Sequence, residues 1–275
     1  MTATDNIAPK LLCACSIDCV LASGFAYSDL DQGAFANYRI INHAFAYRIP
    51  DPIPSIHAGP LMCAGASVFE ALDAANVRPG NRVGVVGVGG LGHVGILFAR
   101  AMGCPVTALN RTTKRMGDAF ALGADTYFSL EDLNTPHYPP TDTRSNSAPG
   151  HGNAGIDVLL ITTNVVPSLD SLLPLLARRA TSVLMTIQTE ALSVPYMPFV
   201  LPGHKLIAST EASVTNHYRM LEFVAQKVVT TGVVNILPWV EQFEMSVDGL
   251  AKAFERLEEG EMRFRGVLVM PESGI

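Results

Sequence analysis

The chain has 275 residues, of which 48% are hydrophobic and 16% are charged. This length exceeds the roughly 100–150 residues of a typical single domain, so we expect one large domain or two interleaved domains with a sizeable core. The formal net charge of -6 argues against a nucleic-acid partner, because duplex binding relies mostly on Lys and Arg. The five cysteines do not match a disulfide framework and indicate a reducing, cytoplasmic compartment.

We also expect no membrane partner. The uncharged stretch 83–99 approaches the ~20 apolar residues that a membrane-spanning helix needs. However, its glycines cluster in a loop-like spacing and arginines bound it at both ends, which favours a buried strand, a turn and a helix.

Short apolar runs alternate with helical periodicity along most of the chain. The first sixty residues contain extended pieces at 34–41 and 44–49, followed by a proline-rich turn at 50–54. Further strands are predicted at 83–86, 106–109, 125–128, 158–161, 182–186 and 206–209. Helices are predicted at 91–102, 114–122, 169–176, 216–227 and 247–258. This alternation predicts an α/β fold, a doubly wound parallel sheet covered on both faces.

Two regions depart from the alternation. Residues 131–155 are rich in Pro, Ser, Thr, Asn and Gly and show no periodicity, so we expect a surface loop insertion there. Near the C-terminus we expect an extended segment at 234–243, interrupted by Pro238, and a final strand at 266–269.

The sharpest motif is the loop Gly87-Val88-Gly89-Gly90-Leu91-Gly92, which lies between a predicted buried strand and a predicted helix. Gly87 permits the tight turn, Gly89 lets the backbone approach a pyrophosphate, and Gly92 lets the helix pack on the strand. The N–H groups at the start of the helix favour an anion. The motif therefore predicts a dinucleotide site.

The end of the next predicted strand selects between NAD and NADP. A carboxylate about 20 residues after the glycines would hold the free ribose diol of NAD. The sequence has Asn110-Arg111-Thr112-Thr113-Lys114-Arg115 there instead, with three cations and two hydroxyls and no acid. These donors suit a 2′-phosphate, so we expect NADP.

With these loops in place, the chain resembles medium-chain zinc-type alcohol dehydrogenases of the cinnamyl-alcohol-dehydrogenase-like branch, especially NADP-dependent fungal members. The segments that carry the resemblance are 58–65, 82–103, 196–199 and 258–269. The resemblance implies an oxidoreductase that interconverts a small-molecule alcohol and an aldehyde or ketone, with NADP carrying the hydride. It also implies a homodimer joined through sheet edges, for which the segment from 182–186 to Pro195 is our candidate, and a role in specialised metabolism.

The resemblance assigns roles to individual residues. Cys63 matches a catalytic zinc ligand, and Ser67 matches a hydroxyl that approaches the cofactor. Thr162, Ser209 and Thr210 match positions that line the nicotinamide end. The loop Gly87 to Gly92 and the loop Asn110 to Arg115 match the pyrophosphate and 2′-phosphate contacts.

The sequence departs from the family at both zinc sites. We interpret the chain as N-terminally truncated relative to the family, without the other catalytic zinc ligands. Catalytic zinc requires three protein ligands, so Cys63 alone does not suffice and is alternatively a buried apolar residue. Cys13, Cys15 and Cys19 do not match the four-cysteine structural site. A paralogue that binds NADP without catalysis and a zinc-independent reductase therefore remain open alternatives.

We expect two domains from this resemblance. Residues 64–212 would form the NADP-binding Rossmann domain, and residues 1–63 and 213–275 would form the remnant of a GroES-like, barrel-type catalytic domain.

Overall fold

The computed structural model describes residues 35–36, 43, 46–133, 155–231 and 236–270. Most of the extended pieces expected at 34–41, most of the insertion expected at 131–155, and Cys13, Cys15 and Cys19 lie outside these residues. By its contacts the chain divides into a central unit, residues 71–210, and a flanking unit, residues 1–70 with 211–275.

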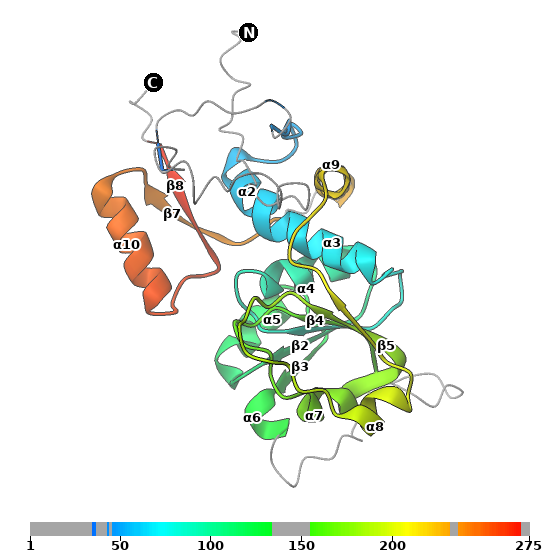
Figure 1. Cartoon of the computed structure of the whole chain (residues 1–275). Helices are drawn as coiled ribbons and strands as arrows, with labels where there is room; N and C mark the ends of the chain where they lie inside the picture. The colour runs from blue at the N-terminus through cyan, green and yellow to red at the C-terminus, as the bar shows by residue number, and fades with distance from the viewer. Residues whose placement is uncertain (1–34, 37–42, 44–45, 134–154, 232–235, 271–275) are drawn as a thin grey trace. The chain divides into compact units, whose positions relative to one another are not determined.

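The central unit is a six-stranded parallel sheet with the strand order β3-β2-β1-β4-β5-β6 (Figure 1). This order, in which β1 and β4 are neighbours and the chain proceeds outward from them, is that of a dinucleotide-binding Rossmann sheet. The strands are β1 (Val83–Val86), β2 (Val106–Asn110), β3 (Thr126–Ser129), β4 (Ile156–Ile161), β5 (Leu176–Leu184) and β6 (Lys205–Ala208). The predicted doubly wound sheet is confirmed.

Helices pack on both faces of this sheet. The helices are α4 (Gly92–Ala101), α5 (Met116–Ala121), α6 (Leu130–Leu133), α7 (Leu169–Leu172) and α8 (Tyr196–Val200), with 3-10 turns at Thr113–Arg115 and Leu173–Leu175. Successive side chains of β1 point to opposite faces of the sheet and so pack against different helices. A Cβ on Gly95 of α4 would lie 3.5 Å from Val85, whereas Val86 belongs to the buried cluster that contains Leu169 and Leu172 of α7.

The strand predicted at 182–186 is present as β5 but spans Leu176–Leu184, and the helical stretch predicted at 169–176 ends at Leu175. Arg179 has a φ of 63°, and the register shifts between Ile156 and Val158, which places an irregularity early in this pairing. In addition, β5 pairs with both β4 and β6. It is therefore not a sheet edge, and the part of the segment expected to join two protomers that lies in β5, up to Leu184, is in an inner strand.

The flanking unit contains helices and a two-stranded parallel sheet. Its helices are α2 (Ser55–Pro60), a π-helical turn (Leu61–Gly65), the first part of α3 (Ala66–Ala74, of which 71–74 belong to the central unit), α9 (Val214–Thr231) and α10 (Val247–Glu258). Its strands are β7 (Val240–Glu244) and β8 (Arg265–Val269). The helical stretch that begins at Ser55 was not predicted, and no strand occurs at 46–49, where an extended piece was expected.

Aromatic packing holds the flanking unit together. Phe69 of α3 packs against Phe223 of α9, with ring centroids 5.8 Å apart. The buried Tyr47 stacks on the imidazole of His217 at 4.8 Å. Among the residues that the structure describes, no helix is long and apolar enough to cross a bilayer.

Candidate dinucleotide-binding site

The glycine loop connects β1 to α4, as predicted, and each glycine has a distinct steric role. Gly87 has a φ of 94°, a conformation that favours glycine. A Cβ on Gly92 would overlap the carbonyl oxygen of Gly87, so only glycine fits where the helix starts. A Cβ on Gly89 would meet nothing within 4 Å. Gly89 therefore borders open space, which the pyrophosphate of a dinucleotide would fill.

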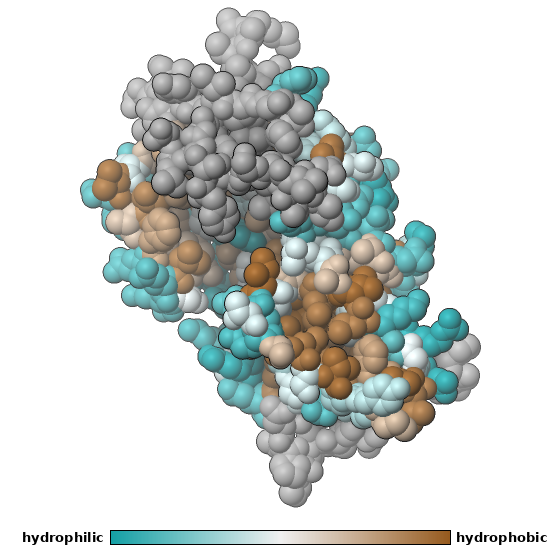
Figure 2. Space-filling view, in the orientation of Figure 1, coloured by the Kyte–Doolittle hydropathy of each residue, from teal (hydrophilic) through white to brown (hydrophobic). Residues whose placement is uncertain are grey.

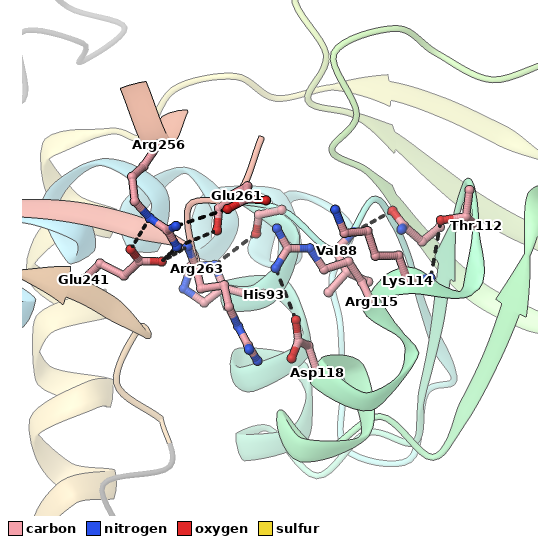
Figure 3. Close-up of polar contacts among 12 residues, drawn as sticks. Val88, His93, Thr112, Lys114, Arg115, Asp118, Glu241, Arg256, Glu261 and Arg263 are labelled. Carbon is pink, nitrogen blue, oxygen red and sulfur yellow. Dashed lines mark hydrogen bonds and ion pairs between the residues drawn. The ribbon is translucent and has the colours of Figure 1, made fainter. Parts of the chain in front are cut away.

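The loop is held from two sides. The Thr162 hydroxyl, just beyond β4, donates hydrogen bonds to the carbonyl oxygens of Val86 at 2.8 Å and Gly87 at 3.0 Å. On the other side, the buried His93 places its Nδ1 3.0 Å from the carbonyl oxygen of Gly89, which also accepts a hydrogen bond from the His93 N–H (Figure 3). No side chain caps α4 at Leu91. The start of this helix is therefore suited to an anionic ligand.

The second loop, 110–115, starts at the end of β2, where the sequence placed the cationic segment. The Oδ1 of Asn110, the last residue of β2, accepts a hydrogen bond from the Val88 N–H at 3.3 Å. Thr112 Oγ1 accepts from the Lys114 N–H at 3.3 Å, and Arg115 forms an ion pair with Asp118 at 3.2 Å (Figure 3). Arg111, Thr113 and Lys114 are exposed. The loop therefore presents hydroxyls and cations next to the glycine loop.

Hydroxyl groups also gather at the carboxyl ends of β4, β5 and β6. Thr186, after β5, donates to the carbonyl oxygen of Thr163 at 2.7 Å. The Ser209 N–H, after β6, donates to the Leu184 carbonyl at 2.9 Å. The Ser209 hydroxyl is buried without a partner among the described residues, and Thr210 follows it as an exposed residue. Thr162, Ser209 and Thr210 follow the carboxyl ends of β4 and β6, the edge at which ligands of open α/β sheets bind. Their contact with a nicotinamide stays a prediction.

Sequence reasoning missed several residues that shape this site. Thr186 was read only as the end of a strand, and His93 was not given its contact with the glycine loop. Tyr127 and Ser129 of β3 contact the carbonyl oxygens of Thr112 and Arg111. Periodicity gives no signal for such contacts, because they connect a loop to the strand that follows it in the chain.

The other two predicted site residues, Cys63 and Ser67, belong to the flanking unit. Ser67 lies half-buried on α3, one turn beyond Cys63, and its contact with a cofactor stays a prediction. Cys63 lies in the π-helical turn with an exposed side chain, so the alternative of a buried apolar cysteine was wrong.

A zinc ion at Cys63 does not fit the residues that the structure describes. Catalytic zinc needs three protein ligands, and nowhere in the described ranges do three His, Cys, Asp or Glu side chains come together. Arg265 of β8 also lies within electrostatic reach of Cys63. A guanidinium at this position disfavours a second cation beside the thiol. We therefore derive no chemical step from zinc.

Comparisons with known proteins agree with this geometry. Residues 90–226 match the family model described as "Zinc-binding dehydrogenase". Cinnamyl alcohol dehydrogenase 8 of Arabidopsis thaliana is 30% identical over 249 residues, which cover 89% of this chain and 63% of the relative. NADP-dependent alcohol dehydrogenase 6 of Saccharomyces cerevisiae is 30% identical over 244 residues, covering 87% of this chain and 62% of the relative.

Solved structures show the same fold. A cinnamyl alcohol dehydrogenase from Sorghum bicolor superimposes with a TM-score of 0.70 at 24% identity, covering 94% of this chain and 72% of that chain. The present chain spans less than two thirds of the length of the curated relatives just named, 62–63%. On these findings, the chain is similar to zinc-binding dehydrogenases of the medium-chain type, and its similar relatives include cinnamyl and NADP-dependent alcohol dehydrogenases.

Proposed function

We propose that this chain binds NADP(H) and serves an oxidoreductase that interconverts a small-molecule alcohol and an aldehyde or ketone. The observation that carries the proposal is a hydrogen bond in the central unit that connects the glycine loop to the loop after β2. The open, glycine-lined turn after β1 is hydrogen-bonded through Val88 to Asn110, which begins an acid-free, cationic loop. A pyrophosphate suits the first loop and a 2′-phosphate suits the second.

Each part of the central unit has a role in this proposal. The loop Gly87 to Gly92 holds the pyrophosphate with backbone N–H groups, while Thr112, Thr113, Lys114 and Arg115 hold the 2′-phosphate. Thr162, Ser209 and Thr210 orient the nicotinamide end, and the unpartnered Ser209 hydroxyl is a free hydrogen-bonding group there. When bound, the cofactor supplies or accepts the hydride. The protein's part is to orient the nicotinamide and to exclude water around it.

The alcohol–aldehyde chemistry rests on the relatives. Those named above are a cinnamyl alcohol dehydrogenase and an NADP-dependent alcohol dehydrogenase. A third relative, 30% identical over 238 residues, is a 1,2-dihydrovomilenine reductase from Rauvolfia serpentina. This range of names supports a small organic substrate and a role in specialised metabolism.

A second candidate is NADP binding without zinc chemistry. Cys63 stands without a set of further metal donors in the part of the chain that the structure describes, and this observation favours either a zinc-independent reductase or a paralogue that binds without turnover. Two measurements distinguish these proposals: the zinc content of the purified chain, and NADPH oxidation with a panel of aromatic and aliphatic aldehydes. Turnover with zinc supports the dehydrogenase, turnover without zinc supports the reductase, and binding without turnover supports the paralogue.

We further propose a cytoplasmic homodimer. Cys63 and Cys104 are free thiols, which suits a reducing compartment. Since β5 is an inner strand, the edge next to it is β6, and we propose that two copies pair there. The residues around it include Ile187, Met197 and Leu201, which are 84%, 55% and 70% exposed. Figure 2 shows hydrophobic side chains gathered on one face of the central unit, as expected for a surface that a partner covers.

A further inference from the structure

The loop after β2 is fixed by hydrogen bonds to its backbone carbonyls. The Tyr127 hydroxyl, from β3, donates to the carbonyl oxygen of Thr112 at 2.5 Å. The carbonyl oxygen of Arg111 accepts from the Ser129 hydroxyl at 3.2 Å and from the Glu131 N–H at 3.2 Å. Two consecutive carbonyl groups of the cationic loop are therefore bound by the segment 127–131.

These bonds determine which way the loop presents its donors. In a trans peptide the C=O and N–H groups point in opposite directions. Thr112, which lies between these two carbonyl groups, is extended, with a φ of -125° and a ψ of 174°. The bonds therefore fix both peptide groups that flank Thr112, and with them the course of the loop as it leaves β2. The exposed side chains of Thr113 and Lys114 extend from the same part of the loop.

Asn110 lies at the start of the same loop, and its Oδ1 accepts a hydrogen bond from the Val88 N–H. Burial raises the pKa of Tyr127, so its hydroxyl stays protonated and able to donate near neutral pH.

The ring of Tyr127 is held independently of its hydroxyl. It packs at a tilt against Phe120 of α5, with ring centroids 6.5 Å apart. Removing the oxygen alone therefore leaves the ring packing in place and removes the hydrogen bond to the Thr112 carbonyl.

We infer that Tyr127 is a positioning residue for NADP selectivity: its hydroxyl holds the loop 110–115 in the conformation that receives the 2′-phosphate. Tyr127 itself does not contact the phosphate in this inference. It acts through the carbonyl of Thr112. Ser129 supports the neighbouring carbonyl in the same way. The inference rests on the proposed NADP binding and adds to it the residue that orders the selective loop.

The test is the Tyr127→Phe variant of the full chain, titrated with NADPH and NADH by fluorescence. Loss of one neutral hydrogen bond predicts a rise in the Kd for NADPH of about threefold to tenfold, with the Kd for NADH unchanged. Competition by adenosine 2′,5′-bisphosphate should weaken by the same factor, and competition by AMP should not. Ser129→Ala should give a smaller change in the same direction.

The matched control is Tyr218→Phe, which removes the same atom from an exposed tyrosine on α9 and should leave both titrations unchanged. An equal loss of NADPH and NADH affinity in Tyr127→Phe would overturn the inference, because it would indicate general damage to the fold. No loss of either affinity would overturn it as well. If the wild-type chain bound neither nucleotide, the proposed function would fail before any variant was compared.

Discussion

The side-chain oxygen of Asn110 lies 3.3 Å from the backbone nitrogen of Val88 and accepts its hydrogen bond. This bond joins the last residue of β2 to the glycine loop, across two neighbouring strands whose register pairs Val86 with Leu109. Residue 110 thus stands where a dinucleotide-binding sheet carries the acid that selects NAD. An amide here keeps the link between the loops and brings no negative charge to the 2′-phosphate.

Changing this amide to a carboxylate should reverse the cofactor preference. In Asn110→Asp the side chain still accepts from Val88, so the fold should persist. The new charge repels a 2′-phosphate and can bind a free ribose diol, so we expect NADPH affinity to fall roughly tenfold or more while NADH affinity rises. Fluorescence titration measures both. Asn81→Asp, which adds the same charge before β1 at the opposite edge of the sheet, is the control. An unchanged preference in Asn110→Asp would contradict this role.

The two glycines of the loop should separate binding from stability. Since a Cβ on Gly89 meets nothing within 4 Å, Gly89→Ala should fold with near wild-type stability but lose NADPH affinity by about tenfold, because the methyl group occupies the pyrophosphate space. Gly92→Ala would force a Cβ against the Gly87 carbonyl and should lower the free energy of unfolding by about 2 kcal/mol. Urea unfolding and titration on both variants test this contrast. Equal stability of the two variants would contradict the steric account.

The central sheet could be predicted well because its signals are local. Val83–Val86 reads as a buried strand from its composition, and the glycine loop and helix after it follow known spacing. The helical stretch that begins at Ser55 could not be predicted in this way, since Gly59, Pro60 and Gly65 interrupt the pattern. Tertiary packing, such as the contact between Phe69 and Phe223, supports it instead.

The residues proposed to face the ligand could be named from the sequence, whereas the residues that support them could not. Gly87, Gly89, Gly92 and the loop 110–115 carry the chemistry in their residue types. Tyr127 supports that loop through a backbone carbonyl, and any residue can offer a carbonyl. The inner position of β5 also could not be read from the sequence, because pairing on both sides depends on where β6 returns to the sheet.

Acid should destabilise the chain partly through Asp157. Burial of this carboxyl works against its charge, but hydrogen bonds from Arg82 more than compensate and lower its pKa. A pKa that is lower in the folded chain than in the unfolded chain gives stability that is present above the unfolded value, about 4, and is lost as the pH falls through the folded value. Asp157→Asn should therefore cost about 1 kcal/mol at neutral pH and flatten the loss of stability below pH ~4.

Urea unfolding as a function of pH measures this effect. The ion pair is 2.8 Å long and roughly one third exposed, which is why the expected cost is small. The exposed Asp51→Asn is the control and should retain the acid-dependent loss. If the Asp157→Asn variant lost stability in acid as the wild type does, Asp157 would not be a cause of that loss.

Association should depend on the apolar surface beside β6. Leu201→Glu places a charge on a side chain that is 70% exposed, so the isolated chain should tolerate it, whereas a dimer would have to bury the charge. We expect sedimentation equilibrium to show a dimer for the wild type and at least tenfold weaker association for the variant. Val229→Glu on α9, at a side chain that is 67% exposed, is the control. A monomeric wild-type chain would contradict the proposed dimer.

The most direct test of the central claim is a fluorescence titration of the purified chain with NADPH and with NADH, together with the zinc content of the same sample. The account predicts micromolar binding of NADPH and much weaker binding of NADH, whatever the zinc content, because the selective loops lie within the central unit. Binding of neither nucleotide, or binding of NADH as tight as that of NADPH, would contradict it.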